Sequence, residues 1–136
     1  MDTMMSVRAQ DQSALSPATI LVVEDEWLVR LPIAEYLRDC GYRVLEASDA
    51  DEAMAMIDSG QTVDLVFSDV RMPGSIDGFG LARWLRRNHP DVPVLLASGY
   101  SGVATPDPEI RSLGRLIEKP YSQPQVARRI EALLSD

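Results

Sequence analysis

Short apolar runs alternate with longer amphipathic stretches from Thr19 to the end of the chain. Runs of this length that are rich in β-branched residues are typical of buried parallel strands, whereas apolar positions that recur every three or four residues indicate helices. The pattern predicts strands at 20–23, 43–46, 63–67, 92–97 and 116–117, and helices at 26–40, 49–59, 78–88, within 101–112 and at 123–134.

Several predicted helices carry residues that suit their ends. Gly41 and Gly60 stand where a left-handed cap would end a helix. Ser122 and Gln125 form a capping box ahead of the last helix. Pro106 and Pro108 interrupt the segment 101–112, so we expect only a turn or two of helix there.

The alternation of strands and helices predicts an α/β fold, with a parallel sheet, right-handed crossovers and helices on both faces. The length allows one such domain, which we place at 19–136. Residues 1–18 show no periodicity and are predicted to form a flexible N-terminal tail. In a parallel sheet the carboxyl ends of the strands lie at one edge, where ligands bind. Functional residues are therefore expected where the strands end.

Charge and composition exclude several classes of function. The formal net charge of -8 disfavours nucleic acid as a partner, because that affinity depends on clustered Lys and Arg. The single cysteine, Cys40, excludes an internal disulfide and favours a reducing compartment. No apolar run approaches the ~20 residues that span a bilayer. We expect a cytoplasmic protein with neither a nucleic-acid nor a membrane partner.

Residues that could carry chemistry follow four of the predicted strands. Glu24 and Asp25 follow the first strand, Asp69 the third, Ser98 the fourth and Lys119 the fifth. Neighbouring carboxylates stay ionised together only if a cation or strong hydrogen bonds compensate their charge. Oxygen ligands without His or Cys favour Mg²⁺, which commonly binds phosphate oxygens as well. Lys119 is the only lysine in the chain, which suggests a specific role for it.

Each of these features has a simpler explanation when it is taken alone. Acidic residues suit the start of a helix, and Asp and Gly are common in turns. Their joint position after four of the five predicted strands is what favours a functional site.

Four segments together resemble the receiver domains of response regulators in two-component signalling. They are ILVVEDE at 20–26, DLVFSDVRMPG at 64–74, VLLASGY at 94–100 and EKPY at 118–121. The resemblance extends over residues 19–134. It implies a doubly wound (βα)5 flavodoxin-like three-layer sandwich, whose five parallel strands have the order 2-1-3-4-5.

The resemblance also implies a phosphorylation site. Asp69 is the expected phosphoacceptor, which takes a phosphoryl group from a sensor histidine kinase or a phosphotransfer protein. Glu24, Asp25, Asp69 and the backbone carbonyl of Arg71 are expected to hold Mg²⁺. Such a carboxylate nucleophile reacts through positioning and charge neutralisation.

Two further residues are implied to contact the phosphoryl group. Ser98 is expected to hydrogen-bond one of its oxygens, and Lys119 to pair with its charge. The bond before Pro120 is expected to be cis. The chain would catalyse only its own phosphorylation and dephosphorylation, and would signal through contacts with an unidentified downstream protein. It would be a stand-alone regulator, a sink that removes phosphoryl groups from the kinase, or the receiver of a hybrid kinase.

The sequence departs from the family pattern at two places. Many receivers carry Tyr or Phe where this chain has Leu116, so we hypothesise that the site couples to the surface through reordering of residues 99–114. The loop at 74–76 is one residue longer than its commonest form. Two alternatives remain: a binding module that does not use phosphate, and a phosphatase with an aspartyl nucleophile. The phosphatase reading is disfavoured because Arg71 stands where such enzymes usually carry a second acid.

Overall fold

A computed structural model of the chain describes residues 17–99 and 116–135. Strands and helices alternate along most of these residues. In chain order they are β1 (Thr19–Val23), α2 (Trp27–Asp39), β2 (Arg43–Ala47), α3 (Ala50–Asp58), β3 (Leu65–Asp69), α4 (Gly78–Asn88), β4 (Val94–Ser98), β5 (Leu116–Glu118) and α6 (Gln123–Ser135).

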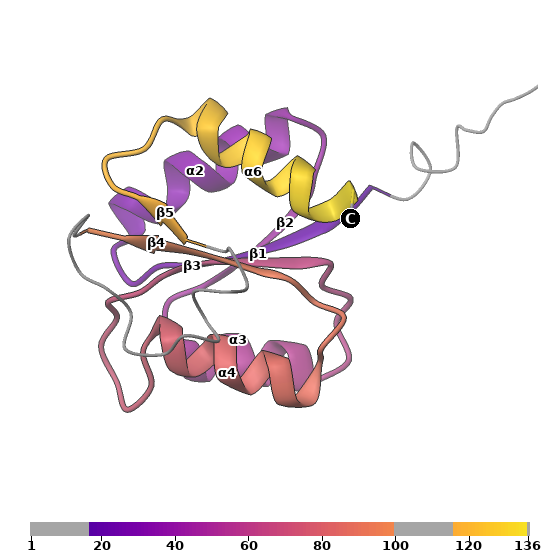
Figure 1. The fold of residues 1–136 in the computed structure, drawn as a ribbon, viewed down its shortest axis with the longest axis vertical. Helices are drawn as coiled ribbons and strands as arrows, with labels where there is room; N and C mark the ends of the chain where they lie inside the picture. The colour runs from indigo at the N-terminus through magenta and orange to yellow at the C-terminus, as the bar shows by residue number, and fades with distance from the viewer. Residues whose placement is uncertain (1–16, 100–115, 136) are drawn as a thin grey trace, which may run out of the picture.

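The strands form one sheet in the order β2-β1-β3-β4-β5, and every neighbouring pair is parallel. The helices α2 and α6 cover one face of the sheet, and α3 and α4 cover the other (Figure 1). The three-layer architecture and the strand order are confirmed. Since β1 lies between β2 and β3, the carboxyl ends of β1 and β3 are neighbours.

The core is divided by the sheet into two apolar layers. Along β1, Ile20 and Val22 pack with residues of α2 and α6, whereas Leu21 and Val23 pack with residues of α3 and α4. All four side chains are at most 1% exposed. A fully buried aliphatic side chain contributes roughly 1.5–3 kcal/mol, so both faces of this central strand fix its position.

Two strands extend further toward the candidate site than the apolar runs predict. The run at 63–67 corresponds to β3 at Leu65–Asp69, and the run at 92–97 corresponds to β4 at Val94–Ser98. Apolar content alone cannot reveal a polar residue inside a strand. Ser68 is fully buried in β3, where its hydroxyl donates to the carbonyl oxygen of Asp69 at 2.8 Å. Asp69 and Ser98 are therefore the last residues of their strands rather than residues beyond them.

The predicted helix ends are confirmed. Gly41 and Gly60 have φ angles of +104° and +97°, in the region that favours glycine. Before α6, the backbone N–H of Ser122 donates to Gln125 Oε1 at 2.7 Å, and the backbone N–H of Gln125 donates to Ser122 Oγ at 3.2 Å. The expected cis bond lies between Lys119 and Pro120.

Two predictions about the fold lie outside the described residues. They are the helical turns within 101–112 and nearly all of the tail at 1–18. Among the residues that the structure describes, no helix combines the length and the apolar character needed to cross a membrane.

Candidate functional site

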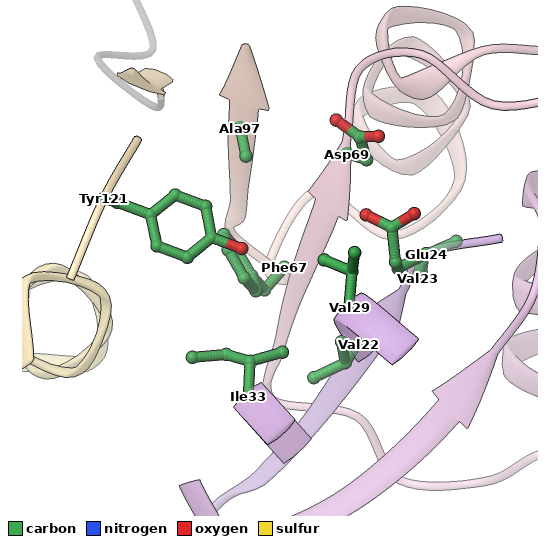
Figure 2. Close-up of a pocket in the computed structure, with 9 residues that line it drawn as sticks. All are labelled: Val22, Val23, Glu24, Val29, Ile33, Phe67, Asp69, Ala97 and Tyr121. Atoms are coloured by element: carbon green, nitrogen blue, oxygen red, sulfur yellow. The ribbon is translucent and has the colours of Figure 1, made fainter. Parts of the chain in front are cut away.

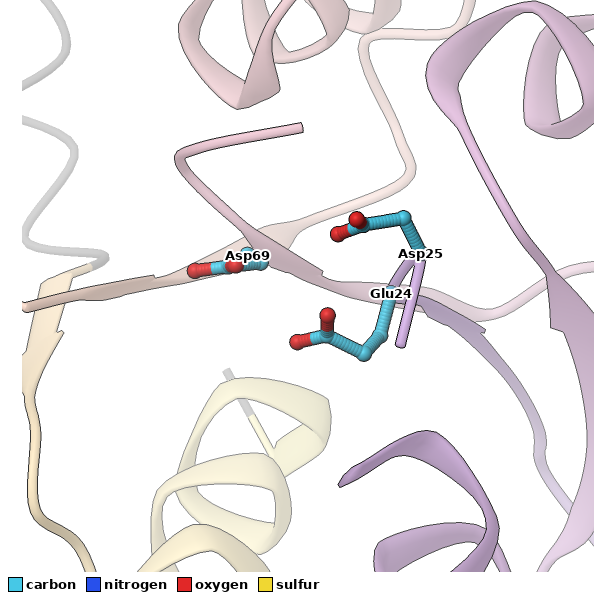
Figure 3. Close-up of side chains that lie close together, drawn as sticks. All are labelled: Glu24, Asp25 and Asp69. Carbon is cyan, nitrogen blue, oxygen red and sulfur yellow. The ribbon is translucent and has the colours of Figure 1, made fainter. Parts of the chain in front are cut away.

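Three carboxylates meet where β1 and β3 end. Glu24, Asp25 and Asp69 each place an oxygen within 4.8 Å of the others (Figure 3). Glu24 is buried, Asp69 is half-buried and Asp25 is exposed. The cluster is therefore open to solvent on one side and backed by protein on the other.

The register of the sheet brings the carboxylates together. Val23 pairs with Ser68 across β1 and β3, so the residues that follow them, Glu24 and Asp69, are adjacent. On the other side of β1, the backbone N–H of Glu24 donates to the carbonyl oxygen of Ala47 at 3.0 Å. Glu24 thus continues the strand pairing by one residue, whereas Asp25 lies in the turn before α2.

Lys119 supplies the positive charge of the site. Its Nζ lies 2.9 Å from Asp69 Oδ1, and the Asp69 side chain is only 10% exposed. The backbone N–H of Lys119 donates to the carbonyl oxygen of Ser98 at 2.8 Å, which ties the loop after β5 to the end of β4. The predicted residues Asp69, Ser98 and Lys119 therefore lie at the ends of three adjacent strands, at the same edge of the sheet.

Arg71 lies two residues beyond Asp69, in the loop that leads to α4. With Asp25, Met72, Pro73 and Asp77 it lines an open hollow next to the carboxylates. The loop closes against the strand through Gly78, whose backbone N–H donates to the carbonyl oxygen of Val70 at 2.8 Å.

Burial dominates the electrostatics of Glu24. It raises the pKa of this carboxyl group from 4.5 to about 7, and the negative charge of Asp69 acts in the same direction. The backbone N–H of Glu26, which donates to Glu24 Oε2 at 3.0 Å, and the charge of Lys119 oppose this increase. Without a further cation, Glu24 is therefore partly protonated near neutral pH.

We expect the free energy of unfolding of the metal-free protein to fall as the pH rises from about 4.5 to about 7. In this range the folded state keeps the proton of Glu24 while the unfolded state has lost it, so a higher pH favours unfolding. One pKa unit corresponds to about 1.4 kcal/mol, so the full shift of this carboxyl group corresponds to a loss of about 3 kcal/mol. Urea unfolding at several pH values measures it.

Glu24→Gln should remove this part of the pH dependence, because glutamine does not titrate. Glu131→Gln on the exposed face of α6 is the matched control and should keep the wild-type slope. Equal slopes for the wild type and Glu24→Gln would contradict the assignment to Glu24.

A small cavity lies behind the carboxylates. Its polar lining comes from Glu24, Asp69 and Tyr121, and its apolar lining includes Phe67 and Ile33 (Figure 2). Tyr121 packs edge-to-face on Phe67, with ring centroids 5.8 Å apart. Burial, together with the charges of Glu24 and Asp69, raises the pKa of the Tyr121 hydroxyl to about 12. This hydroxyl therefore stays protonated near neutral pH and keeps its hydrogen-bond donor.

Sequence reasoning gave Tyr121 no role, although it stands in the EKPY segment directly after Lys119-Pro120. Its position two residues after the only lysine of the sequence was the available signal. Leu116, the departure from the family pattern, is half-buried at the start of β5 and packs against the core layer beneath α3 and α4. The hypothesis that the site couples to the surface through residues 99–114 falls almost wholly outside the described part of the chain.

The donor set fits a hard divalent cation. The three candidate side-chain ligands are all carboxylates, and a cation between them would counter the burial, and the negative charge of Asp69, that now raise the pKa of Glu24. A carboxylate that is paired with a lysine and lies next to a cation site is suited to a reaction in which further negative charge arrives.

Comparison with known proteins agrees with this geometry. The family model of the response regulator receiver domain matches residues 20–131. The sensor kinase CckA of Brucella abortus (strain 2308) is 39% identical over 120 residues, which cover 86% of this chain and 12% of that kinase. The chain thus corresponds to a small part of that relative.

Two of the solved structures that are similar to this chain are matched over nearly the whole length of their own chains. A response regulator receiver protein from Sinorhizobium medicae WSM419 has a TM-score of 0.77 at 30% identity, over 89% of this chain and 97% of that chain. The response regulator TrrA from Thermotoga maritima, in complex with Mg²⁺-BeF, has a TM-score of 0.75 at 29% identity, over 85% and 98%.

Proposed function

Because the chain belongs to the response regulator receiver domain family, we propose that Asp69 accepts a phosphoryl group from a histidine kinase in a Mg²⁺-dependent reaction. An oxygen of the Asp69 carboxylate would attack the phosphorus of a phosphohistidine and form an acyl phosphate. The phosphorus–nitrogen bond would break, and its electron pair would stay on the imidazole. The ion pair of Asp69 with Lys119, within the cluster of carboxylates, is the observation that carries this proposal.

The other predicted residues then have distinct roles. Glu24, Asp25, Asp69 and the backbone carbonyl of Arg71 would hold Mg²⁺, and a neighbour in fold was solved with Mg²⁺-BeF. The bound ion would supply charge neutralisation for the phosphoryl oxygens.

Lys119 and Ser98 would bind the oxygens of the phosphoryl group in addition to Mg²⁺. Lys119 would pair with one oxygen once Asp69 is modified, because the carboxylate that it now contacts would become an acyl phosphate. Ser98, at the end of the neighbouring strand, would donate a hydrogen bond to another. Both residues would therefore stabilise the phosphorylated form.

We place the protein in the cytoplasm, as a signalling phosphoacceptor rather than an enzyme with a separate substrate. Its phosphodonor would be a sensor histidine kinase or a phosphotransfer protein, in keeping with the similarity to part of a sensor kinase. Output would pass through phosphorylation-dependent contacts with a downstream protein.

Intact-mass analysis tests the proposal directly. Incubation with acetyl phosphate and Mg²⁺ should add one phosphoryl group, and chelation of the metal with EDTA should prevent the addition. If acetyl phosphate gives no product, the purified cognate histidine kinase is the second donor. The absence of product with both donors would overturn the proposal in favour of a binding module that does not use phosphate.

An exposed apolar surface next to the carboxylates is the proposed contact for the phosphodonor. It consists of Trp27, Leu28, Val29 and Leu31 in the first turns of α2, directly after the acidic residues. Trp27 is 59% exposed and Leu28 is 71% exposed, and contiguous exposed apolar residues commonly mark protein contacts. A donor protein bound there would lie beside Asp25.

We expect Leu28→Glu to slow phosphotransfer from the kinase by about tenfold, the effect of one well-placed interface residue. Phosphorylation by acetyl phosphate should be unchanged, because that donor needs no docking surface. Ala55→Glu places the same charge at an exposed position of α3, on the opposite face of the sheet, and serves as control. Equal effects of Leu28→Glu on both donors would contradict a docking role.

A further inference from the structure

Arg30 occupies an unusual place in α2. It lies in the first turn of the helix, where the macrodipole disfavours a positive charge. Its side chain is nevertheless only 19% exposed. Specific contacts must therefore compensate for both its position and its burial.

Two hydrogen bonds hold the guanidinium group. Its Nη1 donates to the backbone carbonyl oxygen of Glu24 at 2.7 Å, and its Nε donates to Glu46 Oε1 at 2.9 Å. The second carboxylate oxygen of Glu46 accepts from Arg38 Nη2 at 3.1 Å. Glu46 lies on β2 and pairs with Val22 of β1, so this network is anchored to the sheet.

The carbonyl that Arg30 binds belongs to the peptide between Glu24 and Asp25. The orientation of this peptide decides how the two carboxylates point relative to each other. On one side the strand pairing with Ala47 fixes the N–H of Glu24. On the other side Arg30 is the group that holds the carbonyl, at the point where the chain leaves the sheet for α2.

We propose that Arg30, anchored by Glu46, is a positioning residue that holds the Glu24-Asp25 peptide in the orientation required for Mg²⁺ binding. This inference rests on the proposed function, because it assumes that the carboxylates bind the ion. Arg30 itself would bind neither the metal nor the phosphoryl group, because its guanidinium group is held by the carbonyl of Glu24 and the carboxylate of Glu46. Its planar fork reaches the carbonyl and the carboxylate at the same time, which the single ammonium group of lysine does less well.

Calorimetric titration with Mg²⁺ alone, on the full chain, tests the inference. Arg30→Ala should weaken Mg²⁺ binding by about tenfold, the lower end of the effect of residues that support metal ligands. Arg30→Lys should recover part of the affinity. Phosphorylation by acetyl phosphate should need more Mg²⁺ in Arg30→Ala but reach nearly the wild-type rate at saturation.

Arg38→Ala is the matched control, because Arg38 binds the same Glu46 carboxylate and the carbonyl oxygen of Val44 but not that of Glu24. It should change Mg²⁺ affinity by less than about twofold, well below the effect of a supporting residue. If Arg30→Ala does not fold, Glu46→Gln is tested in its place. It keeps a neutral acceptor for Arg30, so it should lower the Mg²⁺ affinity by less than the loss expected for Arg30→Ala.

Two results would overturn the inference in different ways. If the wild-type protein binds Mg²⁺, and folded Arg30→Ala and Arg38→Ala bind it with equal affinity, the role of Arg30 is refuted but the proposed function is not. A wild-type protein that neither binds Mg²⁺ nor accepts a phosphoryl group would refute the proposed function as well.

Discussion

Asp69→Asn is expected to abolish phosphorylation completely. The reaction needs a carboxylate oxygen as nucleophile, and the neutral amide of asparagine has nearly the same shape but little nucleophilic character. The substitution also removes the charge that Lys119 now contacts at 2.9 Å. Intact-mass analysis with acetyl phosphate and Mg²⁺ should show one added phosphoryl group in the wild type and none in the variant.

Asp77→Asn is the matched control for this experiment. Asp77 lies in the loop after Asp69, where its Oδ1 accepts a hydrogen bond from the backbone N–H of Gly80 at 2.9 Å. Asparagine caps helices about as well as aspartate, so the fold should be retained. Asp77→Asn should be phosphorylated like the wild type. A phosphoryl group on Asp69→Asn would mean that another carboxylate of the cluster is the acceptor.

The fold followed from signals that are local in sequence. Alternating apolar runs predicted the strands, and glycines with a capping box marked the helix ends within a residue or two. The strand order came from the family resemblance rather than from the pattern. The apolar runs at 63–67 and 92–97 end before Asp69 and Ser98 because both strands finish on polar residues. A run of apolar residues therefore cannot mark the last residues of a strand that leads into a functional site, because those residues are polar.

The candidate site was predictable where its residues directly follow strands, as Glu24, Asp25 and Lys119 do. Arg30 could not be recognised, because its contact with Glu46 depends on which strand lies beside β1 and on the register Val22 to Glu46. An arginine in a helical turn normally indicates a solvent-exposed face. Only the assembled sheet shows that this one points inward to a carbonyl.

The tight packing of Gly78 could not be recognised from the sequence either. Gly78 begins α4, as the pattern predicts, and lies against the backbone at the end of β3. A Cβ atom at this position would overlap the carbonyl oxygen of Asp69 and lie 2.8 Å from Val70 Cα. Both neighbours are main-chain atoms at the end of a central strand, so they cannot move aside as a flexible side chain could.

Gly78→Ala is therefore expected to lower the free energy of unfolding by about 3 kcal/mol, at the upper end of the cost of overpacking a core. Urea denaturation measures this. Because any relief requires displacement of the Asp69-Val70 backbone, phosphorylation should also slow in the fraction that remains folded. Gly99→Ala is the control: no atom of residues 17–99 or 116–135 lies within 4 Å of the point that its added methyl group would occupy, so its stability should stay close to that of the wild type. If Gly78→Ala proved as stable as Gly99→Ala, close packing of α4 against the end of β3 would not be what positions Asp69.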